Sequence, residues 1–167
     1  MRRLMLALVA ITVALSATPA TAQTLSDKPW SAGLGLGFIT LDSVAAFAME
    51  IPVEYTFKVG PGELAPHFGF LLAAAKGYTG IALPLGVRYK FRLIKQPLYL
   101  GPLLDLGPTF ATKGGGVGGI LRFGAVLSYL VHKNVEVLFQ PLGLGAVFSE
   151  AGGVFSYNLL VGAQARF

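Results

Sequence analysis

Apolar and polar side chains alternate along most of this chain with a period of two residues. The alternation is cleanest at residues 47–59, where Phe47, Val53 and other large apolar residues take turns with Glu50, Glu54 and other polar or small residues. A β-strand points successive side chains to opposite faces, so this period predicts strands with one apolar and one polar face. Such strands need an apolar neighbour on one side only.

The same alternation recurs between short segments rich in glycine and charged residues. It predicts eight strands, at residues 30–41, 47–59, 67–75, 80–91, 98–110, 121–131, 135–146 and 154–167. Strands of this length can cross a bilayer when they are tilted. Because lipid offers no hydrogen bonds to the backbone, a sheet that crosses it must close on itself. The predicted fold class is therefore all-β, an eight-stranded antiparallel up-and-down transmembrane β-barrel.

Some stretches of this barrel are less regular. For the strands at 98–110 and 135–146, the sequence does not show which face points into the lumen. The first of them is apolar on both faces apart from Asp105. The glycine-rich residues 113–119 are expected to form a flexible loop. Proline cannot donate to a strand ladder, so interior prolines are expected to mark bulges or weakened pairing. These are Pro52, Pro84, Pro102 and Pro141.

Composition agrees with a lipid-facing surface. The chain is 54% apolar and only 13% charged, which is more apolar than a typical soluble domain. It contains no cysteine, and this excludes disulfides, thiol chemistry and a cysteine-linked lipid anchor.

The first residues have the pattern of a cleaved secretory signal peptide. Arg2 and Arg3 precede an apolar run at residues 4–15, and Ala-Thr-Ala follows at 20–22, as signal peptidase requires. The run is shorter than the about 20 apolar residues that a membrane anchor needs. The expected divisions are a signal peptide at 1–22, a short lead at 23–29 and a barrel at 30–167.

Aromatic residues gather near the predicted strand ends, as in the interfacial belts of membrane barrels. The ordinary alternative is that they fill a soluble core. With both termini in the periplasm, the periplasmic belt would contain Trp30, Phe57, Tyr89, Phe91, Tyr129 and Phe167, and the outer belt Phe47, Tyr78, Phe110, Phe148 and Phe155.

The signal peptide, the eight amphipathic strands and the last strand ending in an aromatic resemble the small eight-stranded outer-membrane β-barrels of Gram-negative bacteria. This group includes the transmembrane domain of outer membrane protein A. The resemblance implies an outer-membrane location, outer-membrane lipid as a partner and recognition by the barrel assembly machinery during biogenesis. In that group the last strand is the assembly signal, which would correspond here to alternate residues including Tyr157, Leu159, Val161 and Phe167.

The polar face of the strands would line the lumen, where charges of both signs are expected to pair because isolated buried charges are costly. The sequence therefore predicts a salt-bridged plug around Glu54, Arg88, Asp105 and Arg122. The predicted lumen network consists of Glu50, Glu54, His67, Arg88, Asp105, Arg122, Glu136, Gln140 and Asn158. Further inward polar positions are Lys58, Lys90, Gln164 and Arg166. Inward glycines such as Gly37 and Gly86 could instead leave room for a narrow pore or a small apolar ligand.

No catalytic, cofactor or metal site is expected. His67 and His132 are far apart in the sequence, and neither has a serine at a suitable spacing for acyl transfer. Despite a pI near 9.6, the chain has no basic stripe or helix, so we expect no nucleic-acid partner.

These features favour a structural, envelope-maintaining role, although the fold alone does not specify a function. Three alternatives stay open. They are a narrow pore for small solutes, a soluble lipocalin-like barrel that encloses an apolar ligand, and a lipid-modifying barrel enzyme.

Overall fold

The structure is a computed structural model that describes residues 25–42, 44–93, 97–112, 116–149 and 152–167. The proposed signal peptide at residues 1–22 lies outside the described residues. The elements are the 3-10 helix η1 (Leu25–Asp27) and the strands β1 (Trp30–Leu41), β2 (Val44–Tyr55), β3 (Phe57–Val59), β4 (Gly62–Ala75), β5 (Tyr78–Ala82), β6 (Leu85–Arg92), β7 (Leu98–Ala111), β8 (Gly116–His132), β9 (Val135–Ser149) and β10 (Gly152–Arg166).

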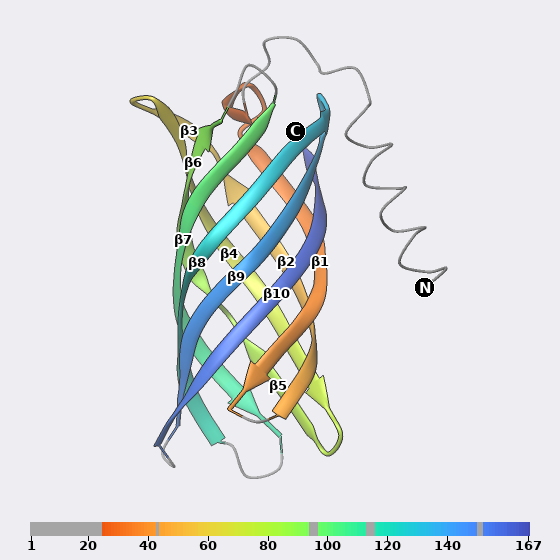
Figure 1. Ribbon diagram of the computed structural model, residues 1–167, viewed down its shortest axis with the longest axis vertical. Helices are drawn as coiled ribbons and strands as arrows, with labels where there is room; N and C mark the ends of the chain where they lie inside the picture. Colours follow the sequence, from red (N-terminus) through yellow and green to blue (C-terminus); the bar gives the residue numbers. More distant parts are fainter. Residues whose placement is uncertain (1–24, 43, 94–96, 113–115, 150–151) are drawn as a thin grey trace, which may run out of the picture.

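The strands form one closed antiparallel barrel in which each strand pairs with the next along the chain (Figure 1). Two of the barrel's eight strands are each interrupted once, as β2 with β3 and as β5 with β6, which accounts for the ten segments. Pairing of β1 with β10 closes the barrel. The predicted eight-stranded up-and-down barrel is confirmed.

The closing seam runs along the whole of β1. It begins at Ser31 paired with Arg166 and ends at Leu41 paired with Ser156. Beyond β10, Phe167 continues the seam, because its amide donates to the Trp30 carbonyl at 2.9 Å and its carbonyl accepts from the Trp30 amide at 3.2 Å. The terminal end of the barrel is defined here as the end that carries this pair, and the distal end as the opposite one.

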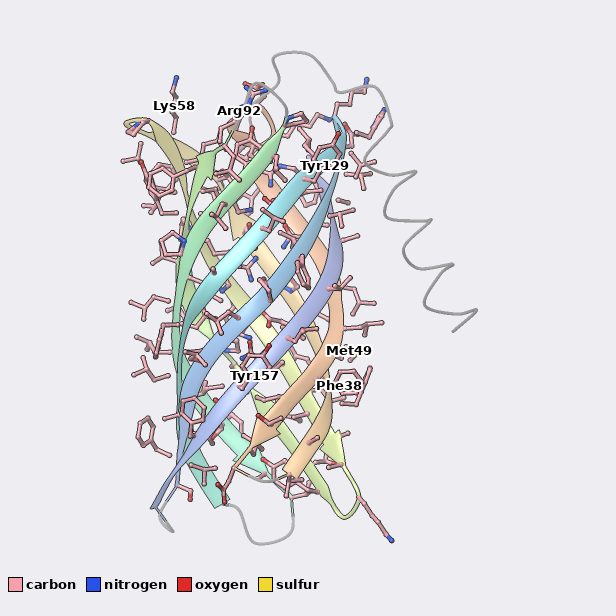
Figure 2. All side chains as sticks on the ribbon, viewed as in Figure 1. Phe38, Met49, Lys58, Arg92, Tyr129 and Tyr157 are labelled. Carbon is pink, nitrogen blue, oxygen red and sulfur yellow. The ribbon has the colours of Figure 1, made fainter. Side chains whose placement is uncertain are left out.

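The wall of the barrel separates two kinds of side chain. Large apolar residues such as Phe38, Phe123 and Phe155 are exposed on the outside, and Figure 2 shows Phe38 projecting away from the wall. Charged residues such as Glu54 and Arg122 are fully buried inside. This arrangement is the reverse of a soluble lipocalin-like barrel, whose apolar side chains would point inward. Among the described residues, no helix has the length and apolar character to span a membrane.

Several strands are longer than the sequence predicted. β4 starts at Gly62, between the strands predicted at 47–59 and 67–75, because residues 62–68 pair with β6 and residues 62–64 also pair with β3. The flexible loop predicted at residues 113–119 is wrong for residues 116–119, which form the start of β8 and pair with β7 and β9. Residues 113–115 lie outside the described part of the chain.

The four interior prolines differ in their effects. Pro84 lies in the break between β5 and β6. Pro141 lies at a register shift, where Asn158 pairs with Gly143 but Leu160 pairs with Gln140. The other two, Pro52 and Pro102, sit within uninterrupted strands, but the pairing of β2 with β1 skips Ile51 and Pro52, and that of β7 with β6 skips Gly101 and Pro102. A bulge, a break or weakened pairing therefore accompanies each of the four prolines.

Candidate functional site

The candidate site is the lumen, where acidic and basic side chains from six barrel strands meet. Alternation along each strand turns these side chains inward, and pairing across the barrel brings opposite charges together. All of them are almost completely buried. The acids are Glu50, Glu54, Asp105 and Glu136, and the bases are Arg88, Lys90, Arg122 and Arg166.

Arg122 on β8 is the centre of the distal part of this network. Its Nη1 and Nη2 donate to Oε2 and Oε1 of Glu50 at 2.7 and 3.0 Å. Its Nε donates to Oδ2 of Asp105 at 2.6 Å. Bidentate pairing of a guanidinium with a carboxylate is both strong and directional. His67 extends the cluster, because its Nε2 lies 2.9 Å from Oδ1 of Asp105.

Arg88 on β6 joins this cluster to the middle of the lumen. Its Nη2 lies 3.6 Å from Oε1 of Glu50, and its Nη1 donates to Oε1 of Glu54. The same Glu54 oxygen accepts from Nε2 of Gln164 at 3.1 Å. Ser31 supports Gln164 by donating to its Oε1 at 3.1 Å. The first strand and the last strand are thereby both tied to the centre of the barrel.

Lys90 and Arg166 continue the network to the terminal end. Nζ of Lys90 donates to Oε2 of Glu54 at 2.9 Å and to Oε1 of Glu136 at 2.8 Å. Nη1 of Arg166 donates to the other oxygen of Glu136, Oε2, at 2.5 Å. A continuous chain of ion pairs therefore runs from Asp105 to Arg166, and His67 contacts it at Asp105.

The 3-10 helix η1 covers the terminal mouth of the lumen. Leu25 is completely buried and packs against Tyr99 and Leu130. Nη2 of Arg166 donates to the carbonyls of Leu25 and Lys28 at 2.7 and 3.0 Å, and Nζ of Lys28 donates to Oδ1 of Asn134 at 2.7 Å. The network and this helix together occupy the terminal half of the lumen.

Two of the inward glycines, Gly37 and Gly86, supply close packing in this lumen rather than free space. A Cβ at Gly86 would overlap Oδ1 of Asp105, and one at Gly37 would overlap the Leu159 carbonyl oxygen. The interpretation that these two glycines leave room for a pore is therefore wrong. A cavity beside Glu50 and Arg88 has a volume of only about 30 Å³.

All nine residues of the predicted lumen network lie inside the barrel. Six of them belong to the ion-pair chain, and His67 contacts this chain at Asp105. Gln140 and Asn158 form a separate pair, with Nε2 of Gln140 donating to Oδ1 of Asn158 at 2.5 Å. The inward positions Lys90, Gln164 and Arg166 also lie inside.

The inward placement of Lys58 is wrong. Lys58 belongs to β3, a three-residue strand whose side chains are all exposed, and Figure 2 shows it extending away from the terminal end. Sequence reasoning also missed Glu63, which is buried on β4 although the sequence predicts a turn there. The docking of Leu25 was missed too, because a single apolar residue in a short lead carries no periodic signal.

The proposed assembly-signal residues share the outward face of the last strand. Val161 and Phe167 are exposed, and Tyr157 and Leu159 are half-buried. The Tyr157 hydroxyl donates to the Pro141 carbonyl at 2.8 Å. Recognition of this strand by the assembly machinery stays a prediction.

The two histidines occupy different environments. His67 is buried in the lumen, whereas His132 is exposed at the end of β8. In the part of the chain that the structure describes, no group of three or more His, Cys, Asp or Glu residues could hold a metal ion. The expected absence of catalytic, cofactor and metal sites stays a prediction.

Comparisons by sequence and by structure give different results. No family model and no curated protein matches the sequence. Among solved structures, a major outer membrane protein from Thermus thermophilus has a TM-score of 0.56 and 14% identity, over 83% of this chain and 98% of that chain. Neisserial surface protein A has a TM-score of 0.53 and 19% identity, over 83% and 96%.

A third similar structure is the outer membrane enzyme PagL, with a TM-score of 0.52 and 14% identity, over 79% of this chain and 97% of that chain. One of these proteins is an enzyme, so similarity of fold does not select an activity. The matches extend over nearly the full length of each of the three matched proteins and over 79–83% of this chain. The chain has the fold of the small eight-stranded outer-membrane β-barrels.

Proposed function

We propose that this protein is an integral outer-membrane barrel with a structural, envelope-maintaining role and a lumen closed by its own side chains. The observation that carries the proposal is the ion-pair chain from Asp105 to Arg166, which occupies the interior behind an apolar outer wall. This distribution of charge suits a wall that faces lipid, because apolar side chains there remain out of water.

The contacts within the lumen support a closed barrel rather than a passage. Glu54 accepts from Arg88, Lys90 and Gln164, so its carboxylate is committed to neighbouring strands. A solute moving through would have to separate such pairs and leave charges buried without partners, which costs several kcal/mol. Docking of Leu25 at the terminal mouth adds a second obstruction.

A non-enzymatic role is part of the proposal. The buried His67 is held against Asp105, and Arg122 binds that same carboxylate, so these groups stabilise the barrel interior. The distal turn at 76–77, between β4 and β5, is short and offers little surface for binding a large partner. We infer that the protein acts through its presence in the membrane and its contacts with outer-membrane lipid.

Membrane integration can be tested by extraction of cell envelopes. We expect the protein to remain in the membrane pellet after washing with high salt or alkali and to be released by detergent. Release by salt or alkali alone would overturn the proposal of an integral barrel. A soluble lipocalin-like protein would be released in this way.

The envelope role can be tested in a deletion strain. Loss of the gene should increase entry of a large antibiotic that the outer membrane normally excludes, and the wild-type chain should restore exclusion. Unchanged permeability in several growth conditions would contradict an envelope-maintaining role. Overexpression should leave the acyl chains of lipid A and phospholipids unchanged, and altered chains would instead indicate a lipid-modifying enzyme.

A further inference from the structure

The distal half of the lumen differs in chemistry from the terminal half. Small and aliphatic residues replace the charges there, and they form one buried cluster that includes Ile39, Ala48, Leu71 and Ile120. The ion-pair layer lies directly beneath this cluster, since Arg122 is the next inward residue after Ile120 on β8 and Glu50 follows Ala48 on β2. The distal lumen is therefore a mainly apolar chamber above a charged floor, with two buried polar residues of β10, Ser156 and Asn158, paired with Leu41 and Ile39.

This chamber contains a cavity of about 30 Å³. Its lining is mostly aliphatic and includes Ile39, Leu71, Ala73, Ala82 and Ile120. A volume of this size accommodates roughly two water-sized groups, but water is retained only where it finds several polar partners. The lining offers mainly aliphatic side chains, so hydrocarbon is a better occupant than water.

Two side chains that carry hydroxyl groups, Tyr78 and Thr109, also line the cavity. Tyr78 is the first residue of β5, and Thr109 on β7 pairs with Ala82. Gly80 makes room for the Tyr78 ring, because a Cβ there would lie 2.5 Å from the Tyr78 hydroxyl oxygen. The cavity is thus mostly apolar, with two hydroxyl-bearing residues in its lining.

We propose that the distal chamber binds the alkyl end of a small amphiphile. The alkyl end enters between Leu71, Ala82 and Ile120, and the polar head remains near the hydroxyls of Tyr78 and Thr109. The charged floor at Arg122 and Glu50 limits how far the alkyl end can reach, so the site selects a short apolar segment. This site depends on the interior of the barrel and not on the proposed envelope role.

The probe is 1-hexanol, with 1,6-hexanediol as the matched comparison. The second hydroxyl of the diol would lie among the aliphatic side chains of the cavity, where it would lose its hydrogen bonds to water. The protein is reconstituted in lipid nanodiscs, and the methyl NMR signals of Ile39 and Ile120 are followed. We expect saturable shifts with hexanol and much smaller shifts with the diol. The methyl signal of Ile51, which is exposed on the outside of the barrel, serves as the control, because it responds to alcohol that partitions into the lipid.

Two substitutions at neighbouring residues distinguish an effect of filling the cavity from an effect of adding the same atoms to the outer face of the barrel wall. Ala73→Leu fills the cavity, whereas Ala74→Leu adds the same atoms on the opposite face of β4, next to Phe47. We expect Ala73→Leu to abolish the saturable shifts and Ala74→Leu to leave them intact. Folding of each variant is checked by its NMR spectrum, and Ala82→Val replaces Ala73→Leu if the latter does not fold.

The source of the alkyl chain is tested without added alcohol. Cross-peaks between the Ile120 methyl and lipid chain protons, lost when the lipids are deuterated, would show that a membrane lipid supplies the alkyl end. Saturable shifts on adding hexanol, without such cross-peaks, would indicate a free amphiphile. Equal responses to hexanol and the diol, or no saturable response and no cross-peak, would overturn the proposed site.

Discussion

Arg122 shows most clearly how single residues determine the state of the lumen. Its guanidinium binds the carboxylates of Glu50 and Asp105 from two other strands. Removal of one partner from a buried ion pair is more damaging than absence of the whole pair, because the remaining charge stays buried. The lumen therefore depends on complete sets of partners.

Replacement of Arg122 by methionine should lower the free energy of unfolding by about 3–5 kcal/mol, since two carboxylates lose their main partner. Urea-induced unfolding of the barrel in lipid vesicles measures this change. Lys58→Met is the control, because Lys58 is exposed on β3 and its loss should have little effect. Equal losses in the two variants would contradict the assigned role of Arg122.

A second prediction concerns the glycine that makes room for Asp105. Gly86→Ala places a methyl group where Oδ1 of Asp105 now lies, whereas the nearest heavy atom to a Cβ at Gly35 would be 3.7 Å away. We expect Gly86→Ala to lower stability by about 1–3 kcal/mol through overpacking, measured by the same unfolding assay. Gly35→Ala should be nearly neutral, and the opposite order would refute this explanation.

Alternation predicted which face of a strand each residue occupies, but not its height in the barrel. It therefore placed Glu54 and Arg88 inside, although the particular pairs depend on registers between strands that a single sequence does not reveal. Lys58 has the inward parity in the sequence, yet β3 lies at the terminal edge beyond the lumen. Glu63 was missed because the glycines and proline before it resemble an ordinary turn.

Among the elements, β10 has two separate roles. Its backbone closes the barrel against β1, and its outward residues carry the proposed assembly signal. Deletion of Phe167 would affect both, because Phe167 also exchanges two backbone hydrogen bonds with Trp30. Substitution of the Phe167 side chain tests the assembly signal alone, because the backbone hydrogen bonds that close the barrel remain.

We predict that Phe167→Ala, which retains those backbone bonds, impairs assembly in the outer membrane far more than Ala163→Leu does. The measurement is the fraction of protein that migrates as folded barrel when unheated envelopes are run on a gel. Deletion of Phe167 should impair assembly at least as strongly as Phe167→Ala. If Phe167→Ala and Ala163→Leu behave alike, the aromatic side chain is not the signal.

The helix η1 gives a prediction at the same scale. Leu25→Asp would bury a carboxylate beside Tyr99 and Leu130, so we expect the helix to leave the mouth while the barrel remains folded. Hydrogen exchange at the Thr56 amide, which donates to the Pro29 carbonyl at 2.7 Å, should accelerate. Leu25→Met should retain protection, and unchanged exchange in Leu25→Asp would argue against docking.

The number and type of elements could be predicted better than their ends. Bilayer-length alternation identified all eight barrel strands, but glycine and proline were interpreted as loops where they lie within β4 and β8. Pairing with β3 and β6 holds Gly62 in its strand, and pairing with β7 holds Gly116 and Gly118, despite the weak intrinsic preference of glycine for strands. The docking of η1 depends on tertiary contacts with Arg166 and Tyr99, which local sequence does not encode.

For the whole molecule, closure follows from an even number of amphipathic strands in a solvent that cannot satisfy an open edge. The separation of the charged network from the mainly aliphatic cluster in the distal half of the lumen was not predicted. It depends on the heights at which residues such as Ile120 and Arg122 meet residues from other strands. The combined result is a barrel whose interior is occupied by its own side chains.

Single-channel recording in planar bilayers tests this closed lumen most directly. Purified folded barrel is inserted, and insertion is verified independently by protection from protease. The ion-pair chain and the docked Leu25 predict no reproducible conductance steps over many verified insertions. Steady, uniform steps from the wild-type barrel would show a continuous aqueous path and would contradict the closed lumen.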